Sequence, residues 1–175
     1  MSDETKTPVS KSPFWRFSVT FYAVPGVAPA CIELQDQAGV DVNVLFFLLW
    51  NATQRRSFNR DQVADIERKI GAWRDMAVVP LRAVRRALRS PPPAIAPEVA
   101  EGFRTRIKAV ELEAERLQQE ALYEMAQSGQ LGDQAASPDE AARRSVTAYE
   151  ATLRPFPQAS LAALLAAFSR FEPPE

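Results

Sequence analysis

A short segment that is apolar on nearly every side of a helix constrains the fold of this chain most. Residues 42–50 read VNVLFFLLW, and Asp41 before them carries a side chain that favours a helix start. A helix that is apolar all round lies in a protein core or in a membrane, and this run is far shorter than the ~20 residues that span a bilayer. The sequence therefore predicts a buried central helix at about 42–53.

The rest of the chain also shows helical rather than strand-like spacing. Helix starts are indicated at Ser12-Pro13 and Ser137-Pro138, where a capping serine precedes a proline in the first helical position. Another is indicated at Asn59 with Gln62, which fit a capping box. No second strand-like run is present to pair with 42–50, which argues against a buried strand there. We expect an all-α, single-domain helical bundle of about seven helices.

Two long helical patterns follow the central segment. The first begins after Asn59 and continues to about Leu88, and Pro80 predicts a kink or break near 76–80 because proline removes a backbone donor. The second covers about 97–127 and carries apolar residues that alternate four and three apart: Phe103, Ile107, Val110, Ala114, Leu117 and Ala121. Either antiparallel packing within the chain or a dimer would explain this seam, and we favour packing within the chain.

Composition excludes several kinds of chemistry. The chain has 175 residues, no histidine, and one cysteine, Cys31. Serine or cysteine hydrolases that use a histidine base, zinc sites with histidine ligands, and thiolate clusters within one chain are therefore excluded. We expect no metal and no cofactor, a buried inert thiol at Cys31, and no disulfide.

Charge and hydropathy give the expected location. The formal net charge is −1, so attraction of the whole molecule to nucleic acid or to anionic lipid is not expected. The first twelve residues are polar and lack the apolar stretch of a secretion signal. We expect a cytoplasmic protein without a membrane span.

A polar rim surrounds the turn before the central helix, and it is the first candidate site. Its members are Glu33, Gln35, Asp36, Asp41 and Asn43. One hypothesis is a Mg²⁺-dependent enzyme site, because Mg²⁺ prefers oxygen ligands. The architectural alternative is that Asp41 caps the helix while Asp36 or Glu33 pairs with an arginine such as Arg16, Arg55 or Arg56.

A cluster of arginines on the following helix is the second candidate site. It consists of Arg82, Arg85, Arg86 and Arg89. A nucleic-acid surface is one interpretation, although no aromatic platform accompanies the arginines. The alternative is a solvated face neutralised by carboxylates of the next helix, at Glu111, Glu113, Glu115 and Glu120.

The region around the central helix resembles a known family. The pattern includes Trp15, Gly26-Val27, LQD at 34–36, Gly39 and DVN at 41–43. It is similar to a conserved hypothetical family of small helical proteobacterial proteins of unknown function, over roughly 13–125. The resemblance implies a bacterial, intracellular, helical protein and brings no catalytic residue with it.

The resemblance also suggests a division of the chain. We expect a disordered tail at 1–11, a helical domain of the resembling family at 12–127, and a C-terminal helical extension at 128–175 that packs on the same domain. Without a catalytic constellation, the favoured function is a non-enzymatic adaptor or regulatory module that binds another protein. The magnesium enzyme and nucleic-acid binding remain the alternatives, and the sequence does not predict the oligomeric state.

Overall fold

The computed structural model describes residues 12–129 and 131–174, so the predicted tail at 1–11 lies outside the described residues. The fold is all-α, as predicted. Its elements in chain order are α1 Pro13–Tyr22, α2 Val27–Ala38, α3 Val42–Thr53, β1 Arg56–Ser57, α4 Arg60–Trp73, the π-helix η1 Arg74–Val78, α5 Val79–Ala87, α6 Pro97–Gln127, β2 Asp133–Gln134, α7 Pro138–Glu150 and α8 Gln158–Phe168. Because α4, η1 and α5 are continuous, the described residues form seven helical rods.

Helix α3 lies at the centre of the fold, which confirms the prediction drawn from its apolar run. Every residue from Asn43 to Ala52 is buried, and the helix packs against α1, α6 and α7. Asp41 caps its start, because one carboxylate oxygen accepts hydrogen bonds from the backbone N–H groups of Asn43 (2.9 Å) and Val44 (3.4 Å).

The predicted helix boundaries on either side are also present. Ser12 caps α1 by accepting from the N–H of Trp15 at 3.1 Å, and Asn59 and Gln62 form the capping box of α4. Gly39 ends α2 with a φ of +75°, a conformation that costs glycine little. Local residues therefore mark both ends of the tight turn between α2 and α3.

The rod that follows β1 changes its geometry at η1, close to the predicted break. The backbone N–H of Val79 donates to the carbonyl of Arg74, five residues back, so the turn is one residue wider than an α-helical turn. Pro80 follows immediately, and a wider turn accommodates a residue that lacks an N–H and crowds the preceding carbonyl. The helix therefore has one wide turn just before Pro80 and continues as α5.

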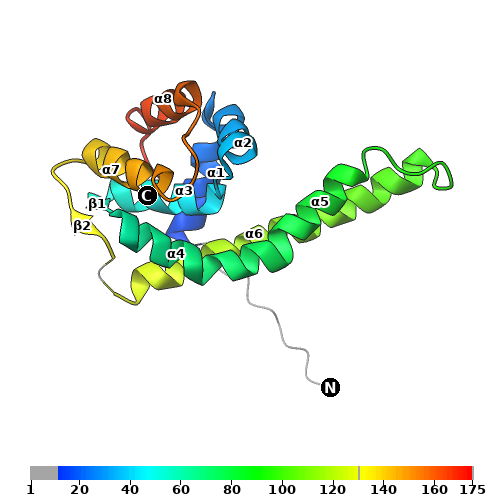
Figure 1. The fold of residues 1–175 in the computed structure, drawn as a ribbon, viewed down its shortest axis with the longest axis horizontal. Helices are drawn as coiled ribbons and strands as arrows, with labels where there is room; N and C mark the ends of the chain where they lie inside the picture. The colour runs from blue at the N-terminus through cyan, green and yellow to red at the C-terminus, as the bar shows by residue number, and fades with distance from the viewer. Residues whose placement is uncertain (1–11, 130, 175) are drawn as a thin grey trace, which may run out of the picture.

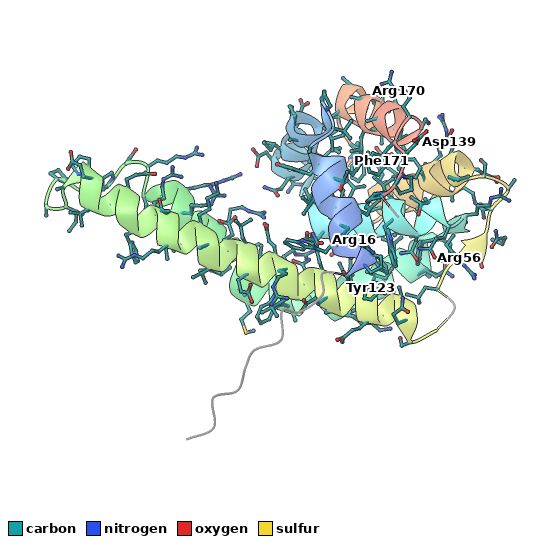
Figure 2. The ribbon with its side chains drawn as sticks, turned by 180° about the vertical axis from the view of Figure 1, so that it is seen from behind. Arg16, Arg56, Tyr123, Asp139, Arg170 and Phe171 are labelled. Carbon is teal, nitrogen blue, oxygen red and sulfur yellow. The ribbon has the colours of Figure 1, made fainter. Side chains whose placement is uncertain are left out.

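Helices α7 and α8 complete the core. Tyr149 and Val146 of α7 pack against α3, and Leu164 and Phe168 of α8 lie in the same core, with α8 against α2. Beyond α8, the Phe171 ring contacts the rings of α1, which Figure 2 shows from behind. The C-terminal segment is thus part of the packed interior.

Two very short strands depart from the purely helical expectation. β1 pairs antiparallel with β2, with Arg56 opposite Gln134 and Ser57 opposite Asp133. The close approach depends on Gly132, because a Cβ there would lie 2.7 Å from the carbonyl oxygen of Ser57. Segments of two residues carry no period-two pattern that a sequence could reveal.

The molecule has a globular part and a projecting part (Figure 1). We call α1–α4, α7, α8 and the second half of α6 the body, and α5 with the first half of α6 the arm. In both views the arm extends away from the body as an antiparallel pair of helices. Of the predicted seam, Ala114 is buried, but Phe103, Val110 and Leu117 are exposed, so the prediction that this seam packs within the chain was wrong for these three.

Among the described residues, no single helix has both the length and the apolar character needed to cross a bilayer. Only α1 and α2 taken together meet that test, and they are bent by 97° relative to each other.

Candidate functional site

A long groove separates the body from the arm, with a volume of about 1200 Å³. One wall comes from α1, α2 and the start of α3, and the other from η1, α5 and the middle of α6. This volume exceeds the ~300–1,000 Å³ of most small-molecule sites. The groove is therefore larger than a typical small-molecule site.

The predicted polar site divides between this groove and another surface. Gln35, Asp36, Asp41 and Asn43 line the groove. Glu33 lies elsewhere: its carboxylate accepts hydrogen bonds from Gln37 of its own helix, at 2.7 Å, and from Ser160 of α8. The five residues therefore do not converge on one point.

All four arginines of the predicted basic patch line the opposite wall of the same groove. Arg82 donates to Glu111 (3.1 Å) and Glu115 (2.7 Å), and Arg85 forms a bidentate pair with Glu111. Burial of Glu111 opposes its ionisation, but the hydrogen bonds from both arginines outweigh burial and hold its pKa below the usual value. Carboxylates of α6 thus neutralise the charges of Arg82 and Arg85.

The predicted carboxylate partners are correct in part. Glu111 and Glu115 neutralise the arginines of the patch, whereas Glu113 and Glu120 pair with Arg116 on their own helix. The expected partners of Asp36 were wrong, because Arg86 of α5 reaches it across the groove at 3.1 Å. The sequence did not indicate Arg86 as the partner of Asp36, because α5 and α2 come close to each other only in the folded chain.

Two contacts bridge the groove and tie the arm to the body. Arg82 donates to the side-chain oxygen of Gln35 at 2.8 Å, and Arg86 pairs with Asp36. The Arg86–Asp36 pair is half-exposed, so it stabilises the closed position weakly. Arg89 and Lys108 also line the groove and have no acidic partner within the described part of the chain.

A buried polar network lies at the inner end of the groove. The amide of Gln118 donates to Asp41 at 2.6 Å, Asn43 donates to Gln118 at 3.2 Å, and Gln119 donates to Asn43 at 2.7 Å. Arg74, the first residue of η1, donates to Asp41 at 3.3 Å. Burial raises the pKa of Asp41, while the hydrogen bond from Gln118 and the charge of Arg74 oppose that rise.

The network continues to α4 and α7 through Glu67 and Tyr149. Arg74 donates to Glu67 at 2.6 Å, and the Tyr149 hydroxyl donates to the other oxygen of Glu67, also at 2.6 Å. Burial, together with the negative charges of Glu67 and Asp41, raises the pKa of Tyr149 well above its ordinary value. Asp41 therefore both caps α3 and belongs to a hydrogen-bond network that spans four helices.

Sequence reasoning did not identify most of this network. Gln118 and Gln119 lie within the stretch that was expected to form an apolar seam, and Glu67 and Tyr149 were not singled out as polar site residues. One signal was present in the long helix: Glu111, Ala114 and Gln118 follow each other at helical spacing, and all three are buried. A polar face beside an apolar seam indicates a second packing surface.

The groove also holds an unusual number of exposed apolar side chains. They come from both walls: Val19 and Tyr22 of α1, Ile32 of α2, Val79 of α5 and Leu112 of α6. Cys31 lines the same groove but is buried, and burial raises the pKa of its thiol to about 12. The thiol is therefore unreactive, as the sequence predicted.

The comparisons with known proteins give the family. Residues 13–122 match the family described as "Protein of unknown function (DUF2390)", which is more than half of the chain. The chain belongs to the DUF2390 family. Searches of curated proteins and of solved structures found no match.

The DUF2390 match covers every element that forms the groove. It begins at the first residue of α1 and ends within α6, beyond Gln119. Helices α7 and α8 lie outside the matched range, although Tyr149 of α7 hydrogen-bonds to Asp41 inside it. Both walls of the groove are therefore built from the region that defines the DUF2390 family.

The carboxylates and amides of the predicted polar site are already engaged by other side chains. Within the described ranges, no three Cys, Asp or Glu side chains are grouped so that they could hold a metal ion. Asp41 is occupied by four donors, and Asp36 by Arg86. The groove instead offers apolar surface with two cations, Arg89 and Lys108.

Proposed function

We propose that this protein is an interaction module that binds an acidic, amphipathic segment of a partner protein in the groove between body and arm. One observation carries the proposal: exposed apolar side chains of both walls face one groove, and two cations on the arm side have no acidic partner among the described residues. Exposed apolar surface that is gathered in a concave site is typical of a protein-binding site.

The charge of the expected segment follows from the arm. Among the described residues, Arg89 and Lys108 lie along the groove without a carboxylate partner, and Arg86 pairs with the half-exposed Asp36 alone. A carboxylate on a bound segment would pair with these cations and compete with Asp36 for Arg86. A helical segment with one apolar face would cover Val79 and Leu112.

The geometry supports the two alternatives less well. A magnesium enzyme would need the carboxylates of the polar rim to converge, whereas Glu33 faces α8 and Asp41 is enclosed by donors. A nucleic-acid surface would need free arginines, whereas Arg82 and Arg85 are occupied by Glu111. Neither alternative uses the apolar side chains of the groove.

A synthetic peptide tests the proposal directly. The probe is a helical peptide with leucine on one face and glutamate on the other, and its control has lysine in place of glutamate. Fluorescence of Trp15, which lines the groove, reports binding. We expect the acidic peptide alone to bind, and its affinity to fall by about tenfold or more in the double variant Arg89→Glu/Lys108→Glu at low salt.

A matched variant controls for net charge. Arg143 and Arg154 are exposed and lie outside the groove, so Arg143→Glu/Arg154→Glu changes the charge equally and should leave binding unchanged. Equal losses in both double variants would show non-specific attraction and contradict the proposal. Binding of single-stranded RNA with a steep salt dependence, and no binding of the peptide, would favour the nucleic-acid alternative.

The partner itself can be trapped in the cell. A photo-crosslinking amino acid at Leu112 faces the groove, and the same group at Arg143 of α7 is exposed outside the groove. We expect a specific protein adduct from position 112 alone, mapped to a segment rich in Asp, Glu and apolar residues. Adducts that are identical at both positions would count against the groove.

A further inference from the structure

The side of the arm that faces away from the groove carries a second apolar surface. It consists of Val99, Phe103, Val110 and Leu117 on α6 with Val84 on α5, all of them exposed. We call this set the outer face. Monomeric proteins rarely leave contiguous apolar surface of this kind uncovered, so the outer face requires an explanation.

The outer face and the groove lie on opposite sides of α6. Val99, Phe103, Val110 and Leu117 are spaced four, seven and seven apart, which places them on one side of a helix. Leu112, in the groove, is two residues from Val110 and thus about 200° around the helix. In Figures 1 and 2 no described helix covers the side of the arm away from the body.

The sequence of the outer face is symmetric about Val110. Phe103 lies seven residues before it and Leu117 seven residues after it. If two copies of α6 cross antiparallel with a two-fold axis at Val110, each Phe103 meets Leu117 of the other copy, and the two Val110 side chains meet on the axis. Such self-matching of one surface is what a two-fold dimer requires.

Charges beside the outer face follow the same symmetry to within one residue. Arg106 lies four residues before Val110, where its guanidinium stacks on the Phe103 ring at 5.5 Å, and Glu113 lies three residues after it. In the antiparallel arrangement, Arg106 of each copy lies beside Glu113 of the other. Opposite charges therefore flank the apolar contact on both sides of the axis, as in antiparallel coiled coils.

We propose that the outer face is a homodimer interface in which two arms pack antiparallel as a four-helix bundle centred on Val110. From Val99 to Leu117 the contact runs for roughly 27 Å along α6. Val84 of α5 extends it sideways to the second helix of each arm. The groove lies on the other side of the arm and stays open in the dimer, so this inference is independent of the proposed function.

The oligomeric state of the full chain tests the inference. Sedimentation equilibrium should show a reversible dimer. Val110→Asp places one unpaired carboxylate from each copy in the interface and should raise the dissociation constant of the dimer by about a hundredfold. Because Val110 is 52% exposed in the monomer, the variant keeps its fold, which circular dichroism checks.

Leu112 provides a matched control on the same helix. It is 50% exposed but faces the groove, so Leu112→Asp should leave the dissociation constant of the dimer unchanged. A chain that is monomeric at every accessible concentration would overturn the inference. So would dimerisation that Leu112→Asp weakens and Val110→Asp does not.

Cross-linking tests the position of the axis. Cys31 is buried, so a cysteine introduced at position 110 is the accessible thiol of the chain. We expect Val110→Cys to form a disulfide-linked dimer under mild oxidation, because a residue on the axis lies next to its own copy. Leu112→Cys should not form one. Equal cross-linking of the two variants would contradict the antiparallel arrangement.

Discussion

The hydroxyl of Tyr149 accepts a hydrogen bond from the backbone N–H of Asp41 at 3.0 Å, although 108 residues separate them in the chain. The same hydroxyl donates to Glu67. A helix near the C-terminus therefore holds the turn that begins the central helix, and it does so through a single side-chain oxygen.

Removing that oxygen should destabilise the protein. Tyr149→Phe leaves the buried N–H of Asp41 and one oxygen of Glu67 without partners, which should lower the free energy of unfolding by about 2 kcal/mol in urea denaturation. Tyr123→Phe is the matched control, because its ring packs on Trp50 but its hydroxyl forms no hydrogen bond with the residues that the structure describes. Equal effects of the two changes would show that the Tyr149 hydroxyl contributes nothing.

The paired carboxylate of the arm should give a pH-dependent contribution. Glu111 is 4% exposed, and its pKa lies below the ordinary value of 4.5. A depressed carboxyl pKa contributes stability above the unfolded value and loses it as the pH falls through the folded value. Glu111→Gln should therefore lower the free energy of unfolding by about 2 kcal/mol at pH 7, and the difference should shrink below pH 4.5.

The control for this variant is an exposed ion pair on the same helix. Glu101 pairs with Arg104 three residues away and is mostly exposed. Glu101→Gln should change the stability at pH 7 far less than Glu111→Gln, because water screens an exposed ion pair. If Glu111→Gln behaved the same way, the buried arginine contacts would not contribute to stability.

Cys31 should resist thiol reagents while the protein is folded. With a pKa of about 12, roughly one thiol in ten thousand is ionised at pH 8, and the side chain is 1% exposed. Reaction with a chromogenic disulfide reagent should be slow in buffer and complete in strong denaturant. A folded protein that reacts at the rate of a free thiol would contradict the burial of Cys31.

If the groove binds an acidic segment as proposed, Asp36 competes with that segment for Arg86. Asp36→Asn should therefore increase the affinity for the acidic peptide by about threefold, because the broken pair is half-exposed and weak. Arg86→Gln should decrease it. Titrations with Trp15 fluorescence would measure both, and a decrease in both variants would show that the Asp36–Arg86 pair shapes the site rather than competing for it.

The sequence predicted the parts of this fold that depend on neighbouring residues. The buried central helix and the caps at Ser12, Asp41 and Asn59 all follow from side chains within a few positions of each other. Such interactions are encoded locally and need no knowledge of tertiary structure.

The candidate site could not be predicted in the same way. The polar rim near residue 36 and the arginines near residue 86 were identified as separate sites, because the sequence does not indicate that α5 lies near α2 in the folded chain. Gln118 was missed for a similar reason, since its partner Asp41 is 77 residues away. The exposure of Phe103 was misjudged because spacing predicts a common face but not what lies against it.

The wide turn at η1 determines which side of the arm meets the body. Each residue advances an α-helix by about 100°, so removing one residue between Arg74 and Val78 would restore ordinary α-helical register and rotate α5 by that angle relative to α4. Arg82 and Arg86 would then lose their alignment with Gln35 and Asp36. The number of residues in this turn, more than their identity, thus fixes the orientation of the whole projecting hairpin.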